Sequence, residues 1–322
     1  MQKMDFDGHA PSFLPEGENW RLVWNDEFDG DALDETKWLY RTCFWGKRFP
    51  AFTDHEGVEL DGASHLRLHM VRNPDGTVSS PHLQTGSLLF DIPRGGSGKK
   101  TFWPFGAPPR PTFLHRYGFY EIRCRFPREN RCWHSAFWLQ APGIGSHPDA
   151  RQAGVECDIM ESYRLAKENL IVAGNLWGGY GDDGHVSNHF RWNHVETPDR
   201  WHYYAVNWEP DCYTFYVDGR RRGRIVSPER AAERRMTPGK DYPREDDVMV
   251  GPVSQVQQFL LVSTEVAGWR SGACSPDANR IELPNYFEVD HVRVFDSEKL
   301  AGTQPVPVDQ AGDLDAKGIF MF

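Results

Sequence analysis

Apolar and polar residues alternate along much of the chain. The alternation is clearest in HLRLHMVR (65–72) and YGFYEIRCRFP (117–127), where it predicts strands with one apolar and one polar face. HSAFWLQAP (134–142) is more continuously apolar, as expected for a strand covered on both faces. The other predicted strands cover residues 20–24, 83–92, 154–163, 170–178, 200–209, 212–225, 258–268 and 286–296. Asp218-Gly219 predicts a hairpin turn inside one of them.

Helical periodicity is nearly absent. The one predicted helix is SPERAAERRM (227–236), where Ser227 can cap the N-terminus and Pro228 suits the first helical position. Long irregular segments, of the kind that carry binding loops, are expected at 93–116, 142–154, 178–199, 237–255 and 269–285. About a dozen strands with a single helix predict an all-β sandwich or jelly roll.

The 322 residues suit one large β domain, because neither an internal repeat nor a linker divides them. Residues 1–19 are polar, contain Pro11 and Pro15, and are expected to form a loose N-terminal lead-in. The predicted domain then covers 20–296, and 297–322 is expected to be a C-terminal surface extension.

Composition and charge exclude several classes of protein. A net charge of −10 argues against general nucleic-acid binding. No run of 18 apolar residues exists to span a membrane as a helix, and the six cysteines show no CxxC spacing for zinc. The N-terminus lacks the apolar segment of a signal peptide, which fits a cytosolic protein or a secreted or periplasmic one with a trimmed leader. A monomer is expected.

GVECDIMESY (154–163) carries three acids within six residues. On a strand, Glu156 and Asp158 share one face, whereas strict alternation would send Glu161 to the opposite, apolar face. Burying a lone carboxylate there would be costly. A β-bulge at Ile159–Met160 restores the parity and brings all three acids to one face, leaving Cys157 in the core as a free thiol.

Three acids on one face have a chemical interpretation. In a retaining glycosidase two carboxyl groups lie about 5–5.5 Å apart; one attacks the anomeric carbon and the other protonates the leaving oxygen. The middle acid would set the charge balance, and crowding should raise the pKa of at least one carboxyl. The alternative is a solvated acidic strand face.

Seven segments in order resemble glycoside hydrolase family 16, which includes laminarinases, agarases and carrageenases. They are WNDEFDGDALDETKW, QTGSLLF, YGFYEIRCRFP, SAFWLQAP, GVECDIMES, WHYYAVNWEPDCYTFYVDG and FEVDHVRVF. The resemblance implies a jelly roll of two curved antiparallel sheets and hydrolysis of β-linked glycans with retention. It matches Glu156 to the nucleophile, Glu161 to the acid/base and Asp158 to the acid between them. The bulged E-x-D-x-x-E spacing is that of laminarinases and galactan-cleaving members.

The resemblance also matches Trp133 and Trp138 to tryptophans of the substrate cleft. Trp103, Trp177 and Trp192 are further candidates for stacking on sugar rings, with core packing as the alternative for each.

Polar candidates for sugar contacts lie beside these tryptophans. His134 follows Trp133 and either bonds a sugar hydroxyl or is satisfied locally. Asn175 lies on the strand after the acids, where laminarinases often carry a histidine, and its presence counts against a β-1,3-glucan substrate.

A structural calcium ion is a second implication of the resemblance. The family's ligand positions correspond to main-chain oxygens of Glu27 and Gly62 and to the Asp290 carboxylate. Such oxygen ligands suit Ca²⁺. The alternative is that Asp290 only pairs with Arg293 or water.

Segment 94–116 is basic in an otherwise acidic chain. Its basic residues are Arg94, Lys99, Lys100, Arg110, His115 and Arg116, and it contains no acid. It could bind sulfate or carboxylate groups of a polysaccharide, with Arg116 as a candidate substrate contact. The alternative is an ordinary solvated loop.

The predicted function is a retaining endo-β-glycanase acting on a polysaccharide, without a catalytic cofactor. A β-1,3-glucan is the first choice of substrate, and a β-galactan, with or without sulfate groups, is the alternative. Two other classes stay open: a non-catalytic carbohydrate-binding jelly roll, and a structural or adhesion domain.

Overall fold

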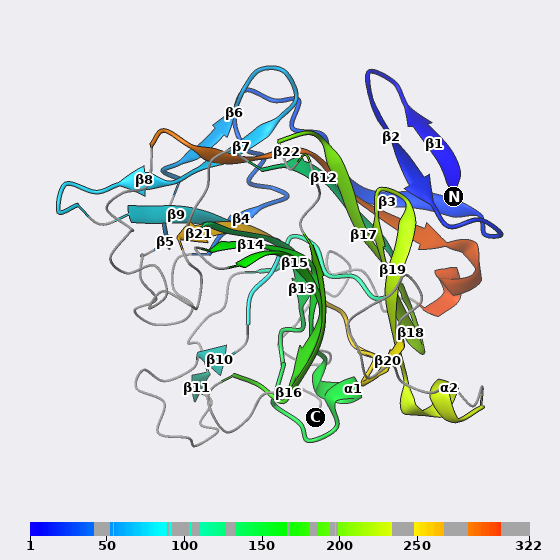
Figure 1. Cartoon of the computed structure of the whole chain (residues 1–322). Helices are drawn as coiled ribbons and strands as arrows, with labels where there is room; N and C mark the ends of the chain where they lie inside the picture. The colour runs from blue at the N-terminus through cyan, green and yellow to red at the C-terminus, as the bar shows by residue number, and fades with distance from the viewer. Residues whose placement is uncertain are drawn as a thin grey trace.

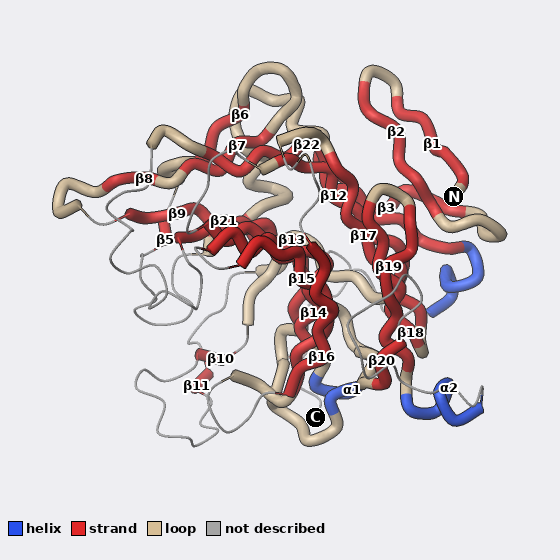
Figure 2. The backbone as a smooth tube through the Cα atoms, viewed as in Figure 1, coloured by secondary structure: helices blue, strands red, loops and turns tan. Residues whose placement is uncertain are grey.

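Two nine-stranded sheets packed face to face dominate the described part of the chain (Figure 1). The computed structural model describes residues 1–41, 52–53, 55–76, 78–88, 90–91, 103–104, 110–126, 133–165, 168–180, 186–193, 197, 199–233, 248–266 and 283–303. Strands dominate this part of the chain, and the short helices lie at its periphery (Figure 2). The expectation of an all-β fold with two antiparallel sheets is confirmed.

Sheet 1 has the strand order β20-β19-β18-β17-β12-β22-β7-β6, with β3 paired to β22. Its strands are β3 (Trp20–Asp26), β6 (Val58–Leu60), β7 (Leu66–His69), β12 (Gly118–Arg125), β17 (His202–Glu209), β18 (Cys212–Val217), β19 (Arg220–Val226), β20 (Val248–Val250) and β22 (Tyr286–Ser297). β18 and β19 form the predicted hairpin, since Asp218 and Gly219 both have positive φ, at 49° and 71°.

Sheet 2 has the strand order β16-β15-β14-β13-β21-β9-β4, with β5 and β8 also paired to β9. Its strands are β4 (Leu39–Tyr40), β5 (Phe52–Thr53), β8 (Val71–Arg72), β9 (Val78–Gln84), β13 (Trp133–Gln140), β14 (Glu156–Leu165), β15 (Glu168–Trp177), β16 (Val186–Asn193) and β21 (Phe259–Val266). Two further strands, β10 (Phe90–Asp91) and β11 (Trp103–Pro104), pair only with each other.

The main core lies between the two sheets because alternate residues of facing strands point inward. Phe137 and Leu139 of β13 pack in one buried cluster with Tyr120 and Ile122 of β12. Cys157 is buried in the same cluster as a free thiol, as predicted. The other face of sheet 2 is therefore left for the acid strand's carboxylates.

The N-terminal residues are ordered, and the expectation of a loose lead-in is wrong. β1 (Gln2–Phe6) and β2 (His9–Leu14) form a hairpin over the outer face of sheet 1 (Figure 1). Leu14 is fully buried beside Phe119 and Phe295. Arg293, also fully buried, donates to the Ala10 carbonyl oxygen and the Ser12 hydroxyl. A few apolar side chains and one arginine therefore outweigh the polar composition of the segment.

The predicted helix is present in shorter form as α2 (Pro228–Glu233), and the Ser227 hydroxyl accepts from the Arg230 amide. α1 (Ala150–Ala153), β16 and β20 lie inside segments expected to be irregular. The described part of the chain ends in a 3-10 helix, η3 (Glu298–Thr303), and the rest of the expected extension lies outside the described residues. Within the described part of the chain, every helix is too short to cross a membrane.

Candidate active site

The acid strand β14 contains the predicted bulge. Phe137 of β13 pairs with Met160, and the next residue, Trp138, pairs with Asp158, so Ile159 is left over. On the other side the register also shifts between Asp158 and Glu161. The extra residue restores the parity, and Glu161 points to the same face as Asp158.

The register defines which residues share the acid face, because directly paired residues of neighbouring strands point the same way. On β13 the partners of the acids are Gln140 opposite Glu156 and Ala136 opposite Glu161. The remaining residues of this face come from the flanking strands: Val172, Gly174 and Leu176 on β15; Ser187, His189 and Arg191 on β16; Phe259, Leu261, Ser263 and Glu265 on β21; His82 and Gln84 on β9. Core residues fill the opposite face.

Glu156 is held by two polar neighbours. Tyr180 donates its hydroxyl proton to Oε2, and Gln140 donates to the same oxygen at 3.2 Å and also to the Tyr180 oxygen. Burial raises the pKa of Glu156 to about 8, and the charge of Asp158 adds to the shift, while the Tyr180 hydrogen bond only partly offsets it.

Asp158 lies at the centre of the acid face, and a histidine from the edge strand contacts it. His189 Nε2 lies 3.0 Å from Asp158 Oδ2, although β15 separates their strands. Gly174 is the residue between them, and a Cβ there would lie 2.8 Å from two atoms of His189 and 2.0 Å from the Asn188 carbonyl oxygen. Glycine therefore leaves the space through which His189 reaches Asp158. Burial and the charge of Glu161 raise the pKa of Asp158 well above its ordinary value.

Glu161 is hydrogen-bonded to a histidine, whereas the cation near Glu156, Arg41, acts on it only through its charge. His134 Nε2 lies 3.0 Å from Glu161 Oε1, and Tyr163 donates to the same oxygen at 2.8 Å. Burial alone would raise the pKa of Glu161, but the hydrogen bond and charge of His134 outweigh it and lower the pKa. The sequence predicted that crowding would raise the pKa of at least one acid. In the structure His134 lowers the pKa of Glu161, so the pKa values of the two glutamates move in opposite directions.

These pKa shifts define a proton distribution. The raised pKa of Glu156 and the lowered pKa of Glu161 favour the proton on Glu156 over Glu161. Moving that proton from Glu156 to Glu161 leaves the net charge of the site unchanged. The two arrangements are therefore tautomers of one charge state, and the acids titrate together rather than one by one.

Of the tryptophans predicted to stack on sugar, one lies on the acid face of sheet 2 and three lie on its core face. Trp138 lies on the acid face; its Nε1 donates to Ser263 Oγ at 3.1 Å, and the Arg41 guanidinium lies 4.9 Å above its ring. Trp133 and Trp192 are buried in the main core, and Trp177 packs against it. The expectation that these three stack on sugar is corrected, because they lie on the opposite face from the acids.

Three other predicted contacts differ from expectation. Asn175 is fully buried on the core face, and its amide donates to the Pro252 carbonyl oxygen at 3.4 Å. Arg116 donates to the Gln255 carbonyl oxygen at 3.0 Å and lies over the Tyr117 ring, so it braces that loop. Trp103 belongs to β11, but its side chain lies outside the described residues, as do Arg94, Lys99 and Lys100.

The implied calcium position does not fit a cation in this chain. Asp290 Oδ2 accepts from Arg123 at 2.9 Å and from His291 at 3.0 Å, and Oδ1 lies 3.6 Å from His65. Although burial opposes ionisation, these partners, His291 first, lower the pKa of Asp290 to about 2. The carboxylate that would bind Ca²⁺ is thus already neutralised, and the main-chain oxygens of Glu27 and Gly62 would lack their charged partner.

Chelation is therefore expected to leave the protein's stability unchanged. Arg123 supplies the positive charge that a metal would bring, and His291 contacts the same carboxylate oxygen, so we expect removal of divalent ions to take nothing from the site. The measurement is the unfolding temperature with and without EDTA, followed by addition of CaCl₂. A fall with EDTA that calcium reverses would contradict it.

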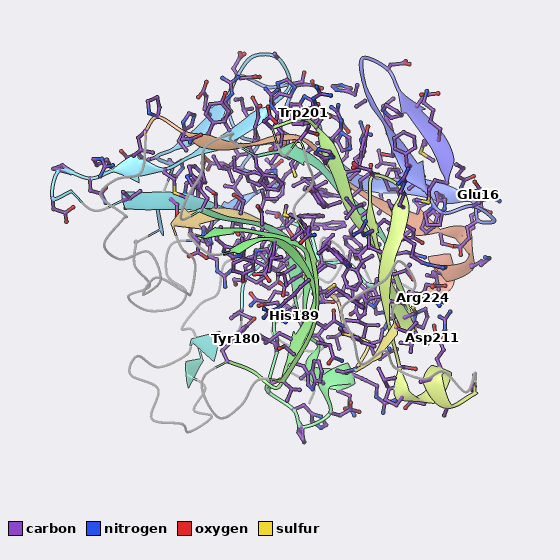
Figure 3. All side chains as sticks on the ribbon, in the orientation of Figure 1. Glu16, Tyr180, His189, Trp201, Asp211 and Arg224 are labelled. Atoms are coloured by element: carbon purple, nitrogen blue, oxygen red, sulfur yellow. The ribbon has the colours of Figure 1, made fainter. Side chains whose placement is uncertain are left out.

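The sequence analysis did not identify two residues that contact the acids, His189 and Tyr180, although the alternating pattern around His189 does indicate a strand. SNHFRWN (187–193) alternates, with Phe190 and Trp192 in the core and His189 on the acid face. Its polar composition and preceding glycines hid the strand. Tyr180 lies in a loop, so periodicity carried no signal for its contact with Glu156. Figure 3 labels Tyr180 and His189, both on the side of sheet 2 that faces away from sheet 1.

Comparison with known proteins agrees with this geometry. Residues 97–246 match the model of the family described as Glycosyl hydrolases family 16. The chain is 24% identical over 281 residues to Glucan endo-1,3-beta-glucosidase A1 of Niallia circulans, covering 85% of this chain and 37% of that protein. It is 25% identical over 251 residues to Beta-porphyranase B of Zobellia galactanivorans, covering 69% of this chain and 76% of the relative. The chain thus spans little more than a third of the first relative's length.

A solved structure shares the fold. The laminarinase catalytic domain from Thermotoga maritima superposes with a TM-score of 0.55 at 19% identity, covering 86% of this chain and 98% of that one. The jelly roll implied by the sequence is thereby confirmed. Over residues 97–246 the chain resembles glycoside hydrolase family 16, and its two facing sheets and bulged acid strand agree with that resemblance.

Proposed function

We propose that this protein is a retaining endo-β-glycanase that cleaves a β-linked polysaccharide with Glu156 and Glu161. The observation that carries the proposal is the bulge in β14, which turns Glu156, Asp158 and Glu161 to one face of sheet 2. An ordinary solvated acidic strand would not need it. Nor would a non-catalytic sugar-binding domain need three crowded acids, one of them, Asp158, 4% exposed.

The first step starts from the tautomer that has its proton on Glu161: Glu156, as carboxylate, attacks the anomeric carbon. The bond from that carbon to the glycosidic oxygen breaks, and this oxygen takes the proton of Glu161. The product is an ester between Glu156 and the sugar, and the shortened glycan leaves with a new hydroxyl group. Tyr180 and Gln140 orient the Glu156 carboxylate for the attack.

In the second step Glu161, now ionised, accepts a proton from water. The water oxygen bonds to the anomeric carbon, the ester bond breaks, and Glu156 returns to its carboxylate form. Two inversions at the same carbon retain the β configuration. Asp158, paired with His189, keeps a neutral or shared-proton group beside Glu156 and so limits charge repulsion during the cycle.

A β-1,3-glucan is the substrate we propose first. Two relatives carry names that match it: the Niallia circulans protein is a glucan endo-1,3-beta-glucosidase, and the Thermotoga maritima domain is a laminarinase. The bulged spacing of the acids agrees with this choice but is shared by galactan-cleaving members, so it does not separate the two substrates. The acid face of β15 carries Val172, Gly174 and Leu176, so the missing histidine on this strand still counts against a glucan.

A β-galactan is the second candidate, and two observations favour it. The relatives include Beta-porphyranase B and Beta-porphyranase D of Zobellia galactanivorans. Arg191 is exposed on the acid face of edge strand β16, in the same row of paired residues as Glu161. A guanidinium there could bind a sulfate group on the sugar.

Cleavage of laminarin, porphyran, agarose and carrageenan side by side should distinguish the two. We expect laminarin to be cleaved at rates that change little between 0.1 M and 1 M NaCl, because the substrate is uncharged. The Debye length falls from about 10 Å to about 3 Å over this range, so binding of a sulfated galactan would weaken.

The variant Arg191→Gln serves as the control for charge. It should leave laminarin cleavage unchanged if the substrate is a neutral glucan. Activity confined to a sulfated galactan, lost with salt and reduced in Arg191→Gln, would overturn the glucan proposal.

A further inference from the structure

Three neighbouring strands of sheet 2 bring a buried carboxylate, a histidine and a second carboxylate into one line. His134 of β13 lies between β14 and β21, where its partners in register are Tyr163 and Glu265. Its Nε2 is 3.0 Å from Glu161 Oε1, and its Nδ1 is 3.3 Å from Glu265 Oε1. His134 is 5% exposed and Glu265 2% exposed, so water screens these contacts poorly.

The contacts to Glu161 converge on one of its two oxygens. His134 Nε2 and the Tyr163 hydroxyl both reach Oε1, and within the described residues Oε2 accepts no hydrogen bond. The His134 and Tyr163 rings also lie against each other, with centroids 4.6 Å apart. Oε1 is therefore the anchored oxygen, and Oε2 is the one that can carry a proton to a substrate.

The charges around His134 favour its protonated form. It faces Glu161 and Tyr163 from β14 and Glu265 from β21, and it interacts electrostatically with Asp158. His189 adds a second histidine near Glu161, from β16. Burial lowers the pKa of His134, but its two carboxylate partners more than compensate and raise it to about 9. Both ring nitrogens then carry protons and donate to a carboxylate on each side.

We infer that His134, anchored by Glu265, is the positioning residue of the acid/base Glu161. It fixes the carboxyl group through Oε1 and stabilises the carboxylate that remains once Oε2 has given its proton to the glycosidic oxygen. Glu265 takes part without touching substrate, by holding the imidazole in place and keeping it charged. The inference rests on the function proposed above for Glu161.

The kinetic experiment compares His134→Gln and Glu265→Gln with wild type. The control is His202→Gln, which removes a histidine paired with Asp218 at 2.8 Å on sheet 1. His134→Gln should lower kcat/KM on polysaccharide by roughly 10- to 100-fold, as for loss of one hydrogen bond to a charged group. The loss should fall mainly on kcat, and it should be smaller on an aryl β-oligoglycoside whose phenol needs no proton.

The pH profile separates positioning from a merely structural role. His134 lowers the pKa of Glu161, so its removal should raise that pKa and move the alkaline limb of kcat/KM to higher pH. Glu265→Gln should lower the pKa of His134 and cause a smaller shift in the same direction. An equal rate loss on both substrates with an unmoved alkaline limb would overturn the inference.

A second readout does not depend on activity. Nitrogen-proton NMR of the histidine rings in the intact protein should find both ring nitrogens of His134 protonated at pH 7.5, with titration near pH 9. In Glu265→Gln the titration should move down towards the ordinary value, about 6.5. If no glycan is cleaved, the proposed function fails. The NMR result still decides whether His134 is paired with Glu161 and Glu265. A wild-type His134 titrating near 6.5 would overturn it.

Discussion

Replacing Glu156 with glutamine is expected to lower turnover of polysaccharide by at least about 10⁴-fold, the scale seen when a covalent nucleophile is removed. The amide has the shape of the protonated carboxyl and can keep the contacts with Tyr180 and Gln140. It cannot form the glycosyl ester, so the first step stops. Binding of the substrate should be retained, because the group lost acts only in the chemical step.

The change in stability caused by Glu156→Gln also has an expected direction. The folded-state pKa of Glu156 is raised to about 8, above its unfolded value near 4.3. The folded protein therefore binds the proton more tightly, and wild-type stability falls as pH rises through this window. Glutamine stays neutral throughout. The unfolding temperature of Glu156→Gln should thus equal or exceed that of wild type, and the difference should widen as the pH approaches 8.

The measurements are turnover of the preferred glycan, its dissociation constant and the unfolding temperature from pH 5 to pH 8. Glu209→Gln is the matched control, since Glu209 is a partly buried glutamate at the end of β17 in sheet 1. It should retain wild-type turnover. Wild-type activity in Glu156→Gln would remove Glu156 from the mechanism, and an unfolded variant would contradict the view that glutamine preserves the local contacts.

Local alternation was enough to predict most strands of both sheets and the bulge in β14. The bulge followed from one physical conflict: strict parity would have directed Glu161 into the apolar core beside Cys157. The structure resolves that conflict with one unpaired residue, Ile159. An argument of this kind needs only neighbouring residues on one strand, which is why it succeeded without knowledge of strand pairing.

The residues around the acids were harder to predict, because their positions depend on register between distant segments. Trp133 and His134 are adjacent, so they point to opposite faces, and only pairing with β14 determines that His134 meets Glu161. Asn175 was assigned to the cleft because laminarinases often carry a histidine on this strand, and Trp177 because its ring could stack on a sugar. The register instead turns Gly174 and Leu176 to that face.

The partners of Asp290 at the implied calcium position depend on strand register in the same way. Asp290 does have the carboxylate that the family position requires, and nothing on its own strand except His291 contradicts a metal. Arg123 reaches it from β12, and His65 approaches from just before β7; both strands are neighbours of β22 in sheet 1. Charge neutralisation by residues far apart in sequence is visible only once the strands are paired.

Replacing Glu161 with alanine is expected to lower cleavage of polysaccharide by about 10²- to 10⁴-fold, the usual contribution of general acid–base catalysis. The glycosidic oxygen of a sugar is a poor leaving group without a proton, and Glu161 is the group proposed to supply it. An aryl β-oligoglycoside with an acidic phenol needs no such proton, so its first step should stay fast. The second step should then be slow, because water has lost its base.

Azide should restore turnover of that aryl substrate, since a small anion can attack the glycosyl ester without base assistance and can occupy the space left by the carboxyl group beside His134. The product should be the β-glycosyl azide, because attack on the α-linked ester of Glu156 inverts the anomeric carbon a second time. Proton NMR of the product measures this directly. Glu156→Gln is the control, in which azide should not give that product. Failure of both azide and the activated substrate to restore activity in Glu161→Ala would remove Glu161 from the acid/base role.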